Sequence, residues 1–257
     1  MLSKINKVVF TLAIVLALIS PIKEKVFAAT PTSVKIAYFF TGPLDEPWAQ
    51  AMYRAVQRVK KDVPNGLKIK DKWFEKVPID DYEKFIRDVV LTGLFDIIWL
   101  HDASAGTDPV DNLRKEFPKQ IFPVTASNYR PVGGNAYWIQ AYAHEAAYLS
   151  GVIAGKVTKT DTIGMVAGFP YASVNHLLNA FADGARSVNS GVKFKVAYIE
   201  AWWDPVKAKE TALAQIEAGA DVIYSERYGA FEAARDKKVL AFGNQADMHD
   251  LAPETII

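Results

Sequence analysis

The sequence predicts an α/β protein built from two doubly wound, parallel-sheet lobes of the Rossmann-like type. Short apolar runs rich in β-branched and aromatic residues alternate with stretches of helical periodicity. The runs recur about every 30 residues and fall into two series of four. Strands and helices that alternate in this way form βαβ units and parallel sheets. Half of the 257 residues are apolar, which is enough to bury the cores of two lobes.

The first series lies in residues 29–127, which we expect to form the first lobe. Its strands are expected at Val34–Phe40, Leu67–Phe74, Asp96–Leu100 and Gln120–Val124. Apolar residues at helical spacing follow the first strand from Trp48 to Val59 and the second from Tyr82 to Val90. A shorter helix is expected to end near Glu116–Pro118.

The second series lies in residues 141–243, after a linker that we place at residues 128–140 because NYRPVGGN is rich in turn-forming residues. Strands are expected at Thr162–Val166, Val192–Ile199, Asp221–Ser225 and Val239–Phe242. Helices are expected at Ala141–Val157, Val174–Asn189, Pro205–Ala218 and Ala230–Lys237. Residues 244–257 are expected to begin a return crossover to the first lobe.

The N-terminus has the three-part pattern of a secretory signal peptide at residues 1–28. Lys4 and Lys7 precede an apolar run of 12 residues at Val8–Ile19, and small residues allow cleavage near Ala28. The run is shorter than the roughly 20 residues that span a bilayer, although an uncleaved anchor remains an alternative. No cysteine follows it, so a lipoprotein anchor is excluded, and we expect a periplasmic or secreted protein.

Charge and cysteine content exclude several classes of function. The chain has 30 basic and 29 acidic residues; the first 28 residues hold four Lys and one Glu, so 26 and 28 remain. A near-neutral chain lacks the basic face that nucleic-acid binding requires. Without cysteine there can be no disulfide, cysteine nucleophile or thiolate metal site.

Two motifs that resemble enzyme signatures fail on inspection. HEAAY at His144–Tyr148 begins like a zinc-protease motif, but Tyr148 stands where the second histidine ligand belongs. GVIAGKV at Gly151–Val157 is one residue short of a phosphate-binding loop and lacks the Ser or Thr that holds magnesium, so it predicts a closely packed helix. With no GxSxG motif either, we expect a binding protein rather than an enzyme, with no metal and no cofactor.

Aromatic side chains gather at the carboxyl ends of the predicted strands, where open parallel sheets bind ligands. Trp48 follows the first strand, and Trp202, Trp203 and Tyr228 follow strands of the second lobe. A flat heteroaromatic ligand gains about 1–3 kcal/mol per stacked face. Because neighbouring residues of extended backbone point to opposite sides, we expect one of Trp202 and Trp203 to stack and the other to pack. From its placement at the strand end, we expect Trp203 to be the one that stacks. The alternative is that these tryptophans are core residues.

Polar side chains in the same loops are candidates for reading the edge of such a ligand. They are Asp102, Asp108, Glu226, Arg227, Asn244, Gln245 and Asp247. For each of them, a solvated loop residue or a helix cap is the alternative interpretation.

Several segments carry a family resemblance. AHEAAYLSGVIAGKVTK, GFPYASVNHLLNAFADGARSVN, AWWDPVKAKETALAQIEAGADVIY and VLAFGNQADM resemble the basic membrane protein family of ABC-importer binding proteins. DEPWAQAM, DIIWL and DPVDNLRKEFP match it more loosely. The family has the type I periplasmic binding protein fold and takes up purine nucleosides and bases. The resemblance therefore implies a small purine ligand and partner permease subunits in the membrane.

The resemblance also implies roles for single residues. Trp48 and Trp203 fall on the family's two stacking aromatics, and Asp108 falls on an acidic residue of a first-lobe loop. Gly229 and Asp247 fall near positions that serve the sugar or base edge.

Two departures from the family pattern bear on the ligand. Phe39 or Phe40 stands where nucleoside binders carry an Asp, and Ala49 replaces an Asn after the first stacking aromatic. The loss of these polar contacts favours a free base such as adenine over a nucleoside.

Other functions remain open at this stage. A receptor that presents a ligand to a signalling partner, a binding protein for a sugar-type ligand, and a secreted enzyme on the same scaffold share the expected fold. Family members continue past the segment that ends at Ile257, so we expect the chain to be a fragment or a truncated product with an incomplete first lobe.

Overall fold

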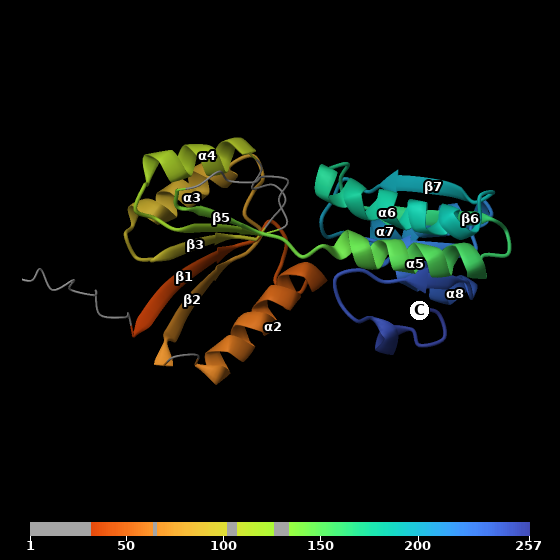
Figure 1. Cartoon of the computed structure of the whole chain (residues 1–257), viewed down its shortest axis with the longest axis horizontal. Coiled ribbons are helices and arrows are strands. Elements are labelled where there is room, and N and C mark those ends of the chain that lie inside the picture. Colours follow the sequence, from red (N-terminus) through yellow and green to blue (C-terminus); the bar gives the residue numbers. More distant parts are fainter. Residues whose placement is uncertain (1–31, 64–65, 102–106, 126–133) are drawn as a thin grey trace, which may run out of the picture. The chain divides into compact units, whose positions relative to one another are not determined.

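The computed structural model describes residues 32–63, 66–101, 107–125 and 134–257. Within them the chain forms two parallel sheets, which Figure 1 shows. This confirms the predicted α/β fold with two parallel-sheet lobes. The expected signal peptide, residues 1–28, lies outside the described residues. None of the described helices is both long and apolar enough to cross a bilayer.

The first sheet has the strand order β2-β1-β3-β4-β5, and all its pairs are parallel. Its strands are β1 (Ser33–Phe39), β2 (Lys68–Phe74), β3 (Ile97–Leu100), β4 (Phe122–Thr125) and β5 (Ala136–Ile139). Alternate residues of β1 enter different cores: Ala37 and Phe39 pack toward α3 (Tyr82–Leu91) and α4 (Thr107–Glu116), and Ile36 and Tyr38 pack toward α2 (Pro47–Asp62). A strand buried on both faces reads as a continuous apolar run, as VKIAYFF does.

The start of α2 is fixed by local chemistry. Glu46 is the N-cap, and its Oε2 accepts a hydrogen bond from the backbone N–H of Ala49 at 3.0 Å. Pro47 occupies the first helical position, where its missing N–H costs nothing. Trp48 is therefore held in the first turn of α2, just beyond the carboxyl end of β1.

The strand β5 corrects one domain boundary. Residues 136–139 were expected to belong to the linker, but they pair in parallel with β4 from Phe122↔Ala136 to Thr125↔Ile139. The strand lies at the edge of the sheet, and Tyr137 and Ile139 are exposed while Ala136 is buried. Four residues with alternating exposure give a weak apolar signal, which is why the pattern resembled a connection.

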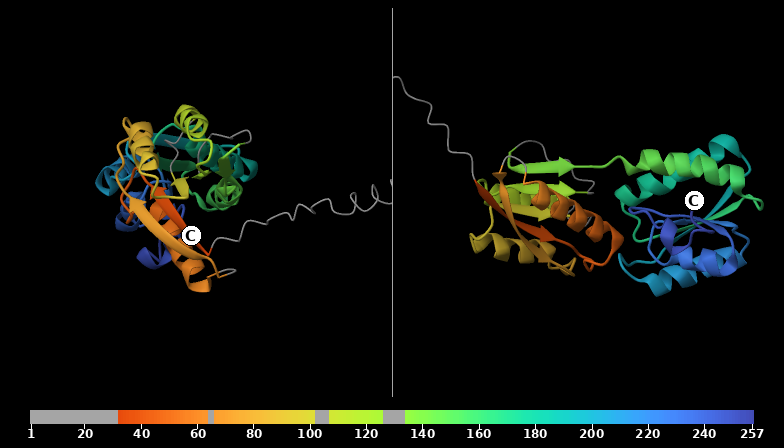
Figure 2. Two further views of the ribbon diagram at one scale, coloured as in Figure 1. Left: turned by 90° about the vertical axis from the view of Figure 1, so that its left-hand side faces the viewer. Right: turned by 90° about the horizontal axis from the view of Figure 1, so that it is seen from below.

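The second sheet has the order β7-β6-β8-β9 and is also entirely parallel. Its strands are β6 (Thr162–Ala167), β7 (Lys193–Tyr198), β8 (Val222–Ser225) and β9 (Leu240–Phe242), and its helices are α5 (Ala143–Val157), α6 (Ala172–Val188), α7 (Pro205–Glu217) and α8 (Ala230–Lys237). One core lies against α5 and α6, and another lies against α7 and α8. The right-hand view of Figure 2 shows the strands between these two helical layers.

Glycines allow α5 and α6 to pack backbone to backbone. A Cβ added to Gly151 would collide with the carbonyl oxygen of Phe181, and one added to Gly184 would collide with that of Tyr148. The interpretation of GVIAGKV as a closely packed helix is thereby confirmed.

The last described segment returns to the second sheet rather than leaving it. After the 3₁₀ helix η2 (His249–Leu251), Ile256 forms a parallel bridge with Ala241 of β9, and Ala241 N donates to Thr255 O at 2.8 Å. Ala252 and Ile256 are buried in the α7–α8 core. Residues 252–257 therefore differ from the expected crossover to the first lobe because their apolar side chains are buried beside β9.

Candidate ligand-binding site

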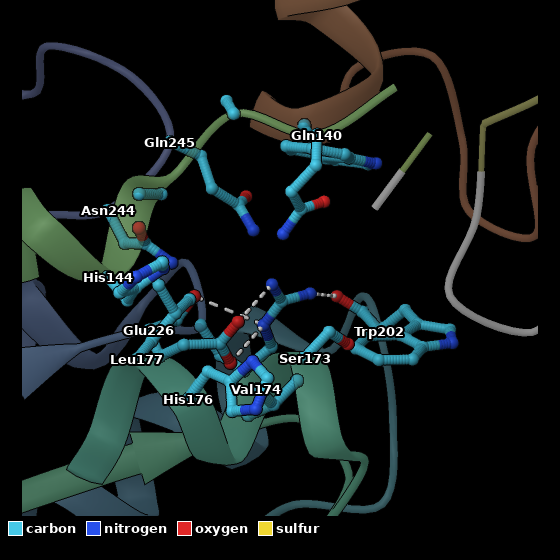
Figure 3. A pocket seen from close by; sticks show the side chains of 14 residues that line it. Gln140, His144, Ser173, Val174, His176, Leu177, Trp202, Glu226, Asn244 and Gln245 are labelled. Carbon is cyan, nitrogen blue, oxygen red and sulfur yellow. Dashed lines mark hydrogen bonds and ion pairs between the residues drawn. The ribbon is translucent and has the colours of Figure 1, made fainter. Parts of the chain in front are cut away.

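A cavity of about 250 Å³ lies at the carboxyl ends of the second-lobe strands. Ligands of open parallel sheets occupy this position because the loops that follow the strands converge there. The cavity is lined by Trp48, Gln140, Ala141, Ala143, His144, Ser173, Val174, His176, Leu177, Trp202, Glu226, Arg227, Asn244 and Gln245. Ten of them are labelled in Figure 3.

Each stretch after a second-lobe strand contributes to the lining. The start of α6 follows β6 and supplies Ser173 and His176, Trp202 follows β7, Glu226 and Arg227 follow β8, and Asn244 and Gln245 follow β9. The segment from β5 into α5 adds Gln140 and His144. The first lobe contributes Trp48 from the first turn of α2.

Glu226 and Arg227 form a buried ion pair in the wall of this cavity. Arg227 donates from Nε and Nη2 to Glu226 Oε2 and Oε1 at 2.9 and 2.7 Å, and Glu226 Oε2 also accepts from Gly168 N at 3.1 Å. Arg227 Nη1 lies 3.6 Å from Glu46 Oε1 of the first lobe. A paired, hydrogen-bonded arrangement is what allows two charges to be buried. The wall is therefore polar but electrically balanced here.

Trp48 is covered by His101, the residue that follows β3. The two rings are stacked, with centroids 4.6 Å apart and planes 9° from parallel. His101 Nε2 donates to the backbone carbonyl oxygen of Trp48 at 3.2 Å, since a carbonyl oxygen can only accept. Burial lowers the pKa of His101 to about 4, so the imidazole is neutral near pH 7.

Trp202 is covered in a comparable way by Arg227. The guanidinium carbon of Arg227 lies 5.2 Å from the centroid of the Trp202 ring, and Nη1 donates to the Trp202 carbonyl oxygen at 2.9 Å. Phe169 adds a tilted ring contact with centroids 4.9 Å apart. Both cavity tryptophans also line a second cavity of about 30 Å³, together with His101 and Glu46.

The remaining polar groups of the lining are neutral amides, a hydroxyl and two imidazoles. Figure 3 shows the side chains of Gln140 and Gln245 pointing toward the same part of the cavity. Among the described residues, Ser173 Oγ, Trp202 Nε1 and Asn244 Nδ2 are buried and have no hydrogen-bond partner. Buried polar groups without partners are rare, and they are explained at a site that a ligand or water completes.

The family follows from a match over most of the chain. The family model described as "ABC transporter substrate-binding protein PnrA-like" (Bmp) matches residues 33–257. The chain belongs to this family. The resemblance to basic membrane proteins is thereby confirmed, and the Bmp family is a class of solute-binding proteins rather than an enzyme class.

Two curated relatives and one solved structure illustrate what this Bmp-family chain is similar to. A purine-binding protein of Brucella abortus is 29% identical over 226 residues, covering 86% of this chain and 63% of the relative. A putative ABC transporter glucose-binding protein of Haloferax volcanii is 38% identical over 152 residues, covering 58% of this chain and 38% of that protein. A solute-binding protein of Aeropyrum pernix superposes with a TM-score of 0.78 at 18% identity, covering 87% and 65% of the two chains. The chain thus spans less than two thirds of the length of these curated relatives.

The structure brings several of the predicted site residues together. Trp48, Arg227, Asn244 and Gln245 line the larger cavity, as does Glu226. Asp102 lies outside the described residues. Asp108 is exposed in the first turn of α4 and is not part of the lining.

The prediction that Trp203 faces the ligand and Trp202 packs in the core is corrected by the structure. Trp202 lines the cavity, whereas Trp203 stacks on Tyr228 with ring centroids 5.3 Å apart, away from it. Tyr228 in turn packs edge-on against Phe231 in the α7–α8 core. Side-chain alternation predicts that only one tryptophan faces the cavity, but it does not say which, because the twist of the loop after β7 decides.

The other family-derived positions also lie outside the larger cavity. Phe39 is fully buried in the α3–α4 core, and Phe40 packs edge-on against His101 and lines only the smaller cavity. Gly229 is the N-cap of α8 with φ of 105°, where an added Cβ would collide with Pro205 O. Asp247 is exposed, and its Oδ1 accepts from His249 N at 3.0 Å. Local turn and packing roles account for these residues.

Sequence reasoning missed the contributions of the helix starts. Four residues line the cavity from the first two turns of α5 and α6 or from just before them: Gln140, His144, Ser173 and His176. For Ser173 and His176, the available signal was their position after a predicted strand, near the amino end of a predicted helix. Gln140 was assigned to the predicted linker, and His144 lies near the start of the helix that follows it. His101 was missed because a stack between residues 53 positions apart leaves no local pattern.

Proposed function

We propose that this chain is the extracytoplasmic substrate-binding component of an ABC importer, and that it binds a purine base or nucleoside by stacking on Trp48 and Trp202. Export through residues 1–28 and delivery to membrane permease subunits belong to this proposal. Membership of a family of substrate-binding proteins supports the transport role. The name of the Brucella abortus relative, a purine-binding protein, supports the ligand class.

The observation that carries the proposal is the pair of indoles at one cavity. Trp48 and Trp202 come from different lobes and line the same space, and no ring contact joins them in the described part of the chain. An aromatic ligand in this cavity can therefore contact both indoles. Base–aromatic stacking contributes about 1–3 kcal/mol per base, which corresponds to a change in Kd of roughly 5- to 150-fold.

The polar lining favours a small, neutral ligand. The charges of Glu226 and Arg227 are paired with each other. The other polar groups of the lining include the side-chain amides of Gln140, Asn244 and Gln245. Amides can donate to ring nitrogens or accept from exocyclic amines. The cavity volume of about 250 Å³ is slightly below the roughly 300–1,000 Å³ of sites for drug-sized ligands, which suits a base.

Calorimetric titration of adenine, adenosine and inosine into residues 29–257 tests the proposal. Trp48→Ala and Trp202→Ala are expected to weaken binding by about 5- to 150-fold each, because each loses a stacked face. Trp203→Ala is the matched control, since this adjacent indole lies off the cavity, and its affinity is expected to stay within about twofold. Purine binding that is unaffected by both Trp48→Ala and Trp202→Ala would refute the stacking.

A sugar-type ligand is the second candidate. The relative from Haloferax volcanii is named as a putative glucose-binding protein and is 38% identical over its matched segment. Indole faces and amides also suit the apolar faces and hydroxyl groups of a pyranose. Titration of glucose and ribose beside the purines distinguishes the two: heat from a sugar and none from any purine would replace the purine proposal.

A further inference from the structure

Each cavity tryptophan makes two contacts with one side chain of its own lobe, one through its ring and one through its carbonyl oxygen. His101 stacks on the Trp48 ring and donates to the Trp48 carbonyl oxygen. Arg227 lies over the Trp202 ring and donates to the Trp202 carbonyl oxygen. In both cases one residue fixes the backbone of the tryptophan and covers its ring, although an imidazole does so in the first lobe and a guanidinium in the second.

We infer that His101 and Arg227 are positioning residues, which hold the indoles of Trp48 and Trp202 in the orientation needed to stack a flat ligand. The inference rests on the proposed function, in which both tryptophans contact a ligand in the larger cavity. Arg227 also lines the larger cavity, whereas His101 acts on the ligand only through Trp48. His101 is absent from the larger cavity, which Trp48 lines, so it covers the indole from another side.

The first argument is entropic. A free tryptophan side chain samples several rotamers, and immobilising such a side chain upon binding costs roughly 0.5–1.5 kcal/mol. A ring that is already stacked has lost that freedom during folding, so the ligand meets a preorganised surface. The hydrogen bonds to both carbonyl oxygens fix the backbone from which each ring projects.

The second argument comes from how the two positioning residues are themselves held. His101 packs edge-on against Phe40, with ring centroids 5.1 Å apart, and is buried. Arg227 is buried and is fixed by two hydrogen bonds to Glu226, which is anchored in turn on Gly168 N. A rigid support of this kind is what a preorganised site requires.

The His101 side chain allows its two contacts to be separated. His101→Phe keeps an aromatic ring over Trp48 and removes the donor, and His101→Asn keeps a donor and removes the ring. Ile98→Ala is the matched control, because Ile98 is a fully buried residue of β3 that contacts the other core. It is expected to lower the melting temperature without changing affinity at a temperature where all variants are folded.

Fluorine NMR of protein labelled with 5-fluorotryptophan reports on the indoles without any ligand. The Trp48 and Trp202 resonances are assigned with Trp48→Phe and Trp202→Phe. In His101→Asn the Trp48 resonance is expected to shift and broaden while the Trp202 resonance stays unchanged. His101→Phe is expected to keep a sharp Trp48 line, and Arg227→Lys to disturb the Trp202 resonance selectively if it folds.

The affinity of the same variants for adenine then shows whether the position of the Trp48 indole affects binding. His101→Asn is expected to weaken binding by about fivefold or more, and His101→Phe to restore it to within about twofold of the wild type. An unchanged Trp48 resonance in His101→Asn, or equal losses of affinity in His101→Asn and Ile98→Ala, would overturn the inference. If the wild type binds no purine, the proposed function fails, whereas the fluorine spectra still decide whether His101 positions Trp48.

Discussion

The two lobes use the same parallel sheet in different ways. The second sheet is covered on both faces by helix pairs, α5 with α6 and α7 with α8, and loops from all its strands reach the cavity. The first sheet is covered by α3 and α4 on one face and, within the described residues, by α2 alone on the other. Among its described residues, Trp48 of α2 lines the larger cavity, and Gln140 lines it directly after the edge strand β5.

The two lobes therefore have different roles toward the ligand among the described residues: the second supplies most of the polar groups, and the first supplies a ring surface. Of the described polar lining residues, Gln140 follows β5 of the first sheet, and the others, including Glu226, Asn244 and Gln245, belong to the second lobe. Within its described residues, the first lobe presents the ring of Trp48, which is backed by His101. We therefore expect changes in the second lobe to alter selectivity, and changes around Trp48 to alter affinity for all aromatic ligands together.

The largest effect is expected where the second lobe buries its charges. Glu226→Gln leaves the Arg227 guanidinium without its bidentate partner, and breaking a buried ion pair costs about 3–5 kcal/mol of unfolding free energy. Glu46, 3.6 Å away, compensates part of this charge, so the lower end of that range is expected. Urea denaturation monitored by circular dichroism measures the change.

The matched control is Glu232→Gln. Glu232 forms a partly exposed ion pair with Lys209 at 3.7 Å, and such pairs contribute about 0–1 kcal/mol. Equal destabilisation by the two substitutions would contradict the assignment of Glu226 and Arg227 as a buried, mutually dependent pair.

The next largest effect is a dependence of stability on pH, caused by the buried His101 of the first lobe. Folding lowers its pKa to about 4 from 6.5, so between these pH values the unfolded chain binds a proton that the folded chain does not. The contribution of His101 to the free energy of unfolding is fully present above pH 6.5. It is lost as the pH falls toward 4, by about 3 kcal/mol in total. Among the residues lining the small cavity beside His101, Glu46 is the other titratable group.

Equilibrium unfolding at several pH values measures this loss. His101→Phe is expected to remove about 3 kcal/mol of the acid destabilisation between pH 6.5 and 4, because phenylalanine binds no proton. If the wild type and His101→Phe lose stability in parallel over that interval, His101 is not held neutral by burial.

The smallest effect compares the sheets themselves. Ile139 on the edge strand β5 is 42% exposed, whereas Ile223 on β8 is fully buried. Ile223→Val is expected to cost about 1 kcal/mol and Ile139→Val less than about 0.5 kcal/mol, because only the buried methyl group leaves a void. Thermal denaturation of the pair provides the test, and equal costs would show that the exposed face of β5 is covered in solution.

The sequence predicted most of the fold because its strands and helices carry strong local patterns. The apolar run of β1 and the start of the helix at Pro205 lie where the sequence predicts them. The edge strand β5 escaped prediction because half of its residues are exposed. Its stability comes from pairing with β4, which no local pattern encodes.

The site was only partly predictable for the same reason. Strand-end placement identified Trp48, Arg227, Asn244 and Gln245, since topology brings the loops after parallel strands together. It could not decide between Trp202 and Trp203, because that depends on the path of the loop. The role of His101 is set by a stack with a distant residue, so it emerges only from the folded chain.

The central claim is that the indoles of Trp48 and Trp202 contact the bound ring system. Intermolecular nuclear Overhauser effects between the ring protons of bound adenine and the tryptophan side chains measure this contact directly. The account predicts effects to the indoles of both Trp48 and Trp202 and none to Trp203. Effects to Trp203, or to neither cavity tryptophan, would contradict it.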